Sequence, residues 1–425
     1  MMRLKFKKPR IRLEMPPRPD FRQVLLPVAV VIFLTMMTKL VVTQNQALEE
    51  PFAGEDMYVR FMLLLGGFAV AASLYSMVAD ANFVTLIAGT CIVFAVGTSY
   101  QFLFDGFNKY CYVGTVSLAA AVVVYAVCRR FHDISDRWFH GIAIAIVVLL
   151  IFNRVFGKYA DGAWLTVPIG SRDNPIFSLQ PGEYVKVLTM ILGACSYQNR
   201  RRSIIYCATT LFACVFLVGV INDLGNTMVI FVMFVLMTYL LFDNRRLSLS
   251  IIAAAAVCLV VLVFLKPHAL SRFTNIFQAM NKRGDMPEQY GAIRGVLFGG
   301  FNGLGLKNCA RTLGVNAIQH DAAMGGVTAV YGIGITTIAM MGYAVLAALP
   351  AYNRSVHPSG YLLLSQFSAY VFMQAALNLG GALDTLPFTG IVAPLISEGA
   401  NQMICFCGLL GLAAAAIHPK VFWKE

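Results

Sequence analysis

The chain has 425 residues, of which 58% are apolar and only 13% are charged. Soluble domains are usually about 45–50% apolar and about 25% charged, so this composition excludes a disordered chain, a disulfide-rich secreted module and a typical soluble enzyme. Half of the formal net charge of +12 falls within residues 1–23. A basic tail before an apolar segment indicates the cytoplasmic side of an anionic membrane, and no recognition fold for nucleic acid follows it.

Twelve apolar segments follow the tail and predict an all-α polytopic membrane protein. A membrane-spanning helix needs about 20 apolar residues, and most of the segments approach that length. The sixth is short and follows Pro181, a residue that suits the first turn of a helix. The segments cover residues 24–42, 61–79, 83–104, 111–128, 138–156, 182–196, 203–221, 225–242, 249–265, 322–349, 360–383 and 399–418.

The charges between the segments predict how the chain is oriented. With a cytoplasmic N-terminus, the arginine runs at 129–130, 200–202 and 245–246 fall on the cytoplasmic side, and Asp105 falls outside. This agrees with the positive-inside rule. We therefore expect residues 1–23 and 419–425 to be cytoplasmic.

Two outer segments, 157–181 and 266–321, are too long to be simple connections and are rich in glycine and charge. The second, between the ninth and tenth spans, is expected to be a large outer loop. Its basic residues favour a site for an anionic headgroup such as a diphosphate, because arginine offers bidentate donors. The alternative is a solvated loop, since long loops cross the membrane regardless of charge. These basic residues are Lys266, Arg272, Lys282, Arg283, Arg294, Lys307 and Arg311.

Other polar residues lie next to apolar segments. Glu183 and Lys186 are three apart and so share one helix face, either as a functional pair or as an ion pair that only fixes the helix. Asp223 stands where a helix would begin, and it either caps that helix or serves a site. The glycines between 299 and 305 do not form a phosphate loop, because no Gly-Lys-Ser/Thr follows. They indicate a tight re-entrant turn or a close approach to a ligand.

Taken in order, these segments resemble the SEDS family of bacterial wall synthases, the family of RodA, FtsW and SpoVE. The resemblance spans residues 160–418. The family's Gln-Pro-Ser-Glu has Gly182 in place of Ser, and its Asp-Leu-Gly-Thr reads Asp-Leu-Gly-Asn-Thr here. The matching residues are Gly162-Ala163-Trp164, Gln180 to Glu183 with Lys186, Asp223 to Thr227, Arg272, Asp285, Pro287, Tyr290, Gly299 to Gly305, His320-Asp321, Asn378, Leu386-Pro387, Thr389-Gly390, Pro394, Ile396-Ser397 and Gly399.

The resemblance implies a peptidoglycan glycosyltransferase that polymerises lipid II at the outer face of the bacterial cytoplasmic membrane, in elongation or division, beside a class B penicillin-binding protein. Residues 24–156 would be N-terminal helices and 157–418 the catalytic membrane core. Asp285 would be the catalytic residue, because a carboxylate can take the proton of an attacking hydroxyl. The departing diphosphate needs cations, either arginine and lysine or a divalent ion such as Mg²⁺ or Mn²⁺. The implied substrate-binding residues are Arg272, Glu183, Lys186, Arg294, Lys307, Asp223, Trp164 and His320.

Proteins of other classes stay open as alternatives. A lipid II flippase or transporter would place ionisable groups on helices near the middle of the membrane, as Glu183 and Lys186 are placed. A non-catalytic scaffold of the division or elongation machinery would tolerate the departures from the family motifs.

Overall fold

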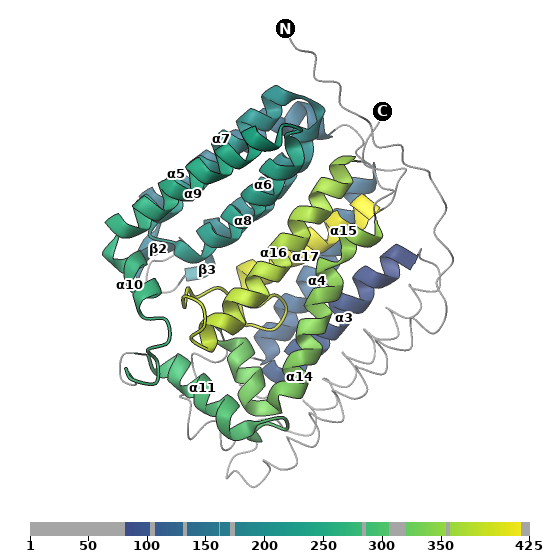
Figure 1. The fold of residues 1–425 in the computed structure, drawn as a ribbon. Helices are drawn as coiled ribbons and strands as arrows, with labels where there is room; N and C mark the ends of the chain where they lie inside the picture. Colours follow the sequence, from purple (N-terminus) through teal and green to yellow (C-terminus); the bar gives the residue numbers. More distant parts are fainter. Residues whose placement is uncertain are drawn as a thin grey trace.

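The computed structural model describes residues 81–102, 107–130, 134–160, 162–170, 175–282, 286–305, 320–353 and 358–417. Within these residues the helices form two groups that lie side by side, α5 to α9 in one and α3, α4, α14, α16 and α17 in the other (Figure 1). Helices α6 and α8 of the first group contact α16 of the second. The helices are α3 (Ala81–Gln101), α4 (Phe107–Arg130), α5 (Ile134–Phe156), α6 (Pro181–Cys195), α7 (Arg200–Phe216), α8 (Leu224–Leu241), α9 (Arg245–Leu265), α10 (Pro267–Thr274), α11 (Pro287–Gly299), α14 (Ala323–Ala347), α15 (Leu349–Tyr352), α16 (Pro358–Ala382) and α17 (Ala400–Ile417).

The helical prediction holds for the described part of the chain. Ten of the expected spans coincide with helices to within a few residues, and the spans expected at 24–42 and 61–79 lie outside the described residues. Seven helices among the described residues are long and apolar enough to cross a membrane. Helices α3 and α4 contain shorter apolar stretches, and α6 has 15 residues, as the short sixth segment suggested.

Short-range signals explain where several helices begin. Pro181 occupies the first turn of α6, where its missing N–H costs nothing. The Asn199 side chain accepts a hydrogen bond from Arg202 N at 2.9 Å at the start of α7. Asn244 accepts from Arg246 N at 3.1 Å at the start of α9. Each cap satisfies a backbone donor that the helix itself leaves open.

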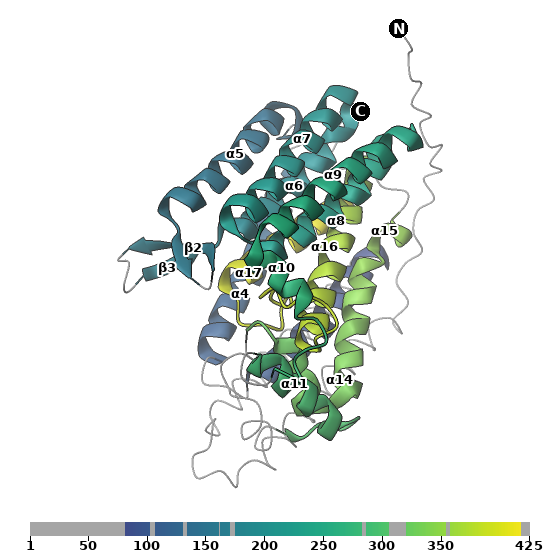
Figure 2. The same cartoon turned by 60° about the vertical axis from the view of Figure 1, so that its left-hand side comes forward.

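The two outer segments contain short regular elements that the sequence did not indicate, within a fold that is otherwise helical in the described residues. Residues 157–181 contain a three-stranded antiparallel sheet of β1 (Lys158–Ala160), β2 (Ala163–Gly170) and β3 (Pro175–Leu179), in the order β1-β2-β3. The second segment contains α10 and α11. The sheet, α10 and α11 share one end of the bundle, and α15 lies at the other (Figures 1 and 2). Strands this short leave too little alternating pattern to be recognised in a sequence.

The glycine run between 299 and 305 is a tight turn packed against a break in α14. Gly332 interrupts α14 with φ of 87° and ψ of 174°. The break frees backbone groups, and Leu304 N donates to Ala329 O at 2.8 Å. A Cβ at Gly303 would lie 2.2 Å from Val330 O, so the turn can approach the broken helix only without a side chain. The geometry favours the re-entrant turn that the sequence left as one alternative.

Candidate functional site

A buried ion pair lies in the first turns of α6. Lys186 Nζ is 2.7 Å from Glu183 Oε1, and the two side chains are 0% and 3% exposed. The spacing of three places both on one helix face, as expected. The Lys186 ammonium also lies 5.5 Å from the centre of the Tyr370 ring of α16. Because desolvation of two charges opposes a buried pair, this one must be held by further polar partners or retained for a function.

Asp223 lies at the start of α8, next to a distorted end of α7. The chain leaves α7 through a π-helix, Leu217–Ile221, and Asn222 then adopts a left-handed conformation with φ of 64°. Asp223 accepts hydrogen bonds from Asn226 N at 3.0 Å and from Asn226 Nδ2 at 2.7 Å. Asn222 Nδ2 donates to Gly162 O at 3.0 Å, which ties this turn to the sheet. Asp223 is therefore the expected cap, and it is only 7% exposed.

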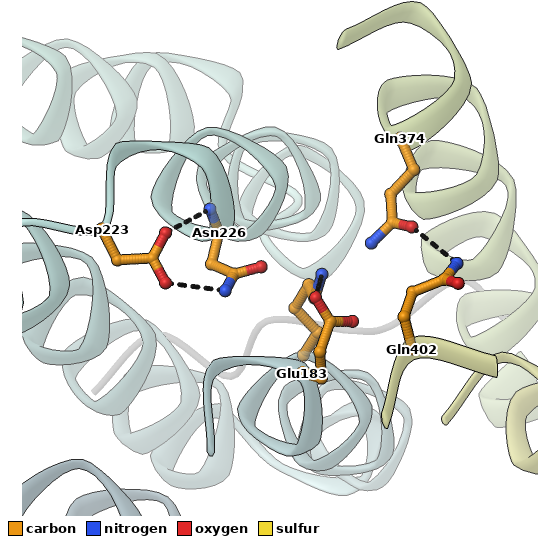
Figure 3. A network of polar contacts seen from close by, with 6 residues as sticks. Glu183, Asp223, Asn226, Gln374 and Gln402 are labelled. Carbon is orange, nitrogen blue, oxygen red and sulfur yellow. Dashed lines mark hydrogen bonds and ion pairs between the residues drawn. The ribbon is translucent and has the colours of Figure 1, made fainter. Parts of the chain in front are cut away.

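These groups belong to a buried polar cluster of Glu183, Lys186, Asp223, Asn226, Gln374 and Gln402, drawn in Figure 3. The Gln374 and Gln402 amides, from α16 and α17, are 3.1 Å apart. With the Gln374 amide turned over, its oxygen accepts from Lys186 Nζ at 2.6 Å. Sequence reasoning missed Asn226, Gln374 and Gln402 as site residues. Their signal is an amide side chain inside an apolar helix, where a polar group needs a partner.

Some acceptor atoms of the buried polar cluster have no hydrogen-bond donor among the described residues. Glu183 Oε2 and Asn226 Oδ1 are buried and have no hydrogen-bond partner among the described residues. A buried acceptor without a partner costs about 1–3 kcal/mol, so this arrangement suits a site that receives donors such as hydroxyl or amide groups.

The non-helical segment 383–399, between α16 and α17, connects the cluster with other candidate residues. A Cβ at Gly225, in α8, would lie 2.7 Å from Ile391 Cγ1 of this segment. Arg272 Nη1 of α10 donates to Phe388 O. His320 Nδ1 donates to Glu398 O at 3.0 Å. The segment therefore contacts both the start of α8 beside Asp223 and the two predicted residues Arg272 and His320.

The same segment anchors the stretch that leads toward Asp285. Phe277 N donates to Asp384 O at 3.1 Å, and Ala279 N donates to Asp384 Oδ2 at 2.8 Å. Asp285 and Lys307 lie outside the described residues. The anchoring thus fixes the chain a few residues before Asp285.

Two predicted binding residues lie on other elements. The Arg294 guanidinium, on α11, sits 5.6 Å from the Tyr290 ring centre and 5.4 Å from that of Phe298. Trp164, on β2, stacks against the Arg154 guanidinium at 4.4 Å. In these contacts the charged groups rest on aromatic faces, which stabilises the guanidinium without using up all of its hydrogen-bond donors.

A divalent cation finds no preformed site in the described part of the chain. No group of three or more histidine, cysteine, aspartate or glutamate side chains gathers among those residues. In the buried polar cluster one carboxylate is paired with Lys186 and the other caps α8.

Comparisons with known proteins agree with the motif pattern. The family model described as a cell cycle protein, that of FtsW, RodA and SpoVE, matches residues 77–420. The probable peptidoglycan glycosyltransferase FtsW of Bacillus subtilis is 27% identical over 299 residues, which cover 64% of this chain and 72% of that protein. Its counterpart in Haemophilus influenzae is 25% identical over 308 residues, 68% of this chain and 76% of that one.

Solved structures share the fold. A chain from a structure concerning the coordination of polymerization and crosslinking by a peptidoglycan synthase complex has a TM-score of 0.62 at 20% identity, covering 78% of this chain and 96% of that one. RodA of Thermus thermophilus has a TM-score of 0.54 at 20% identity, covering 78% and 95%. Identities this low establish the fold alone.

Proposed function

Because the chain belongs to the SEDS family of FtsW, RodA and SpoVE, a family of multi-pass membrane proteins, we propose that it is a peptidoglycan glycosyltransferase. It polymerises lipid II into glycan strands at the outer face of the bacterial cytoplasmic membrane. The end of the bundle with the sheet, α10 and α11 faces outward, and both termini are cytoplasmic, in keeping with the arginine runs of the opposite connections.

The reaction joins two lipid-linked sugars. A hydroxyl oxygen of the acceptor forms a bond to the anomeric carbon of the donor, and the bond from that carbon to the donor's diphosphate breaks. Asp285 takes the hydroxyl proton as the attack proceeds. Arg272, Arg294 and Lys307 stabilise the negative charge that develops on the departing polyprenyl diphosphate.

The observation that carries the proposal is the double contact of segment 383–399. It lies against the start of α8, beside the buried polar cluster, and it also receives hydrogen bonds from Arg272 and His320. One segment thus joins an acceptor-rich cluster to the basic stretch that leads to Asp285. A sugar linked to a polyprenyl diphosphate offers hydroxyl donors to the buried polar cluster and a diphosphate to the basic stretch.

A class B penicillin-binding protein is the proposed partner. Its transpeptidase would crosslink the glycan that this chain makes, as the coordination of polymerization and crosslinking in the similar complex suggests.

Reconstitution with lipid II tests the function. We expect the purified protein, in liposomes with its partner transpeptidase, to convert labelled lipid II into glycan strands. Movement of labelled lipid across the vesicle without polymerisation would support a flippase instead. If neither activity appears with any cognate partner, the protein is a scaffold and the proposed function is wrong.

Charge reversal at Arg272 should weaken use of the diphosphate-linked donor. We expect Arg272→Glu to raise KM for the donor roughly tenfold to a hundredfold, because a charged hydrogen bond contributes about 1.5–3 kcal/mol. Arg245→Glu is the matched control, because Arg245 Nη1 also donates to a backbone carbonyl, that of Tyr239. Arg245 lies at the start of α9, whereas Arg272 lies in α10, which follows the end of α9. Steady-state kinetics with varied donor would show the difference, and equal KM values in both variants would remove Arg272 from the site.

A further inference from the structure

Gly182 is a glycine for reasons of space. It lies in the first turn of α6, and its φ is not positive. The backbone conformation at this position therefore does not require glycine. A Cβ at this position would lie 2.4 Å from Asn226 Nδ2 and 3.3 Å from Asp223 Oδ2. The first distance is far below van der Waals contact. A side chain at 182 and the present Asn226 therefore cannot occupy these places together.

The Asn226 amide cannot rotate away from the clash without losing its hydrogen bond to Asp223. Its side chain is 3% exposed, and its Nδ2 donates to Asp223 Oδ2 at 2.7 Å. Turning the amide over would put its oxygen against a carboxylate that only accepts hydrogen bonds. Moving it away would break the bond to Asp223. The other relief is a shift of the first turn of α6, which carries Glu183 as its next residue.

We propose that Gly182 and Asn226 form a size-matched pair, in which Asn226 is a positioning residue that holds the Asp223 carboxylate beside the Glu183–Lys186 pair. Gly182 stands where the family motif has Ser, and in the fold it faces Asn226. The missing side chain at 182 thus leaves the space that Asn226 fills between α6 and α8. The effect of this pair on polymerisation rests on the proposed function, whereas its effect on folding does not.

A double-mutant cycle tests the pair. We expect Gly182→Ser to lower the thermal unfolding midpoint of the purified protein and to lower the rate of lipid II polymerisation at least about tenfold, because small displacements of positioned groups are costly. In the Asn226→Ser background, where Nδ2 is gone, adding Gly182→Ser should change the rate by less than roughly threefold. Asn226→Asp keeps the volume but replaces the Nδ2 donor by a carboxylate oxygen, which leaves Asp223 only the bond from the backbone N of residue 226. It should therefore lower kcat while Gly182 stays in place.

Gly408→Ser in α17 is the matched control, because a Cβ there meets no atom within 4 Å. It should leave both readouts unchanged. Rates are compared below every unfolding midpoint. If Gly182→Ser costs as much in the Asn226→Ser background as it does beside the native Asn226, the proposal is wrong. If Gly182→Ser alone fails to fold, a folded double variant supports the pairing and an unfolded one overturns it. If the parent does not polymerise lipid II, the proposed function fails, and the midpoints alone decide on the pair.

Discussion

Replacing Asp285 by asparagine is expected to abolish polymerisation of lipid II while the protein stays folded. Asparagine has nearly the same size but cannot accept the proton of the attacking hydroxyl. General-base catalysis contributes about 100- to 10,000-fold, so the remaining rate should fall below detection in a glycan-strand assay. The unfolding midpoint should match that of the parent, because the substitution conserves volume.

Glu288, three residues further, offers the control for this experiment. Glu288→Gln removes a carboxylate from the same stretch, and we expect it to polymerise at close to the parental rate. If Asp285→Asn is as fast as the parent, Asp285 is not the catalytic base. If Glu288→Gln is the inactive variant instead, the role of base passes to that residue.

Breaking the buried ion pair of α6 should have the largest effect on stability. Lys186→Met leaves the Glu183 carboxylate buried without its partner, and such a loss costs about 3–5 kcal/mol. Chemical denaturation of the purified protein should measure it. The pair of Lys109 and Glu398, 3.0 Å apart, is the control, and there the Lys109 side chain reaches solvent whereas that of Glu398 is 11% exposed. Lys109 is 70% exposed, so Lys109→Met should cost less than about 1 kcal/mol.

The double variant Glu183→Gln/Lys186→Met separates a structural from a functional role of the pair. With both charges gone, no buried charge is left unpaired, and stability should return close to the parental value. If the pair belongs to the substrate site, polymerisation stays lost despite that recovery. A double variant that polymerises like the parent would show that the pair only supports the fold.

The sequence predicted those parts of the site that depend on near neighbours. The spacing of Glu183 and Lys186 predicted a shared helix face, and their ion pair joins residues three apart. Pro181 predicted the start of α6, and Asp223 predicted a cap, because both effects act within one helical turn. Long apolar runs predicted the helices for the same reason, since each helix satisfies its own backbone hydrogen bonds within the membrane.

The connecting segments were predicted less well. The sheet in 157–181 and the helices α10 and α11 are short, so local pattern does not distinguish them from loops. The glycines between 299 and 305 indicated a turn, but the helix it packs on is broken at Gly332, which lies beyond the reach of the motif itself.

Tertiary structure alone decided which residues share the site. Arg272 meets Phe388, 116 residues away, and His320 meets Glu398, 78 residues away. Gln374 and Gln402 join Lys186 from two other helices, and Asn226 fills the space that Gly182 leaves. The physical reason is that apolar helix surfaces are much alike, so a membrane sequence indicates that helices form, whereas their packing decides which polar side chains they bring together.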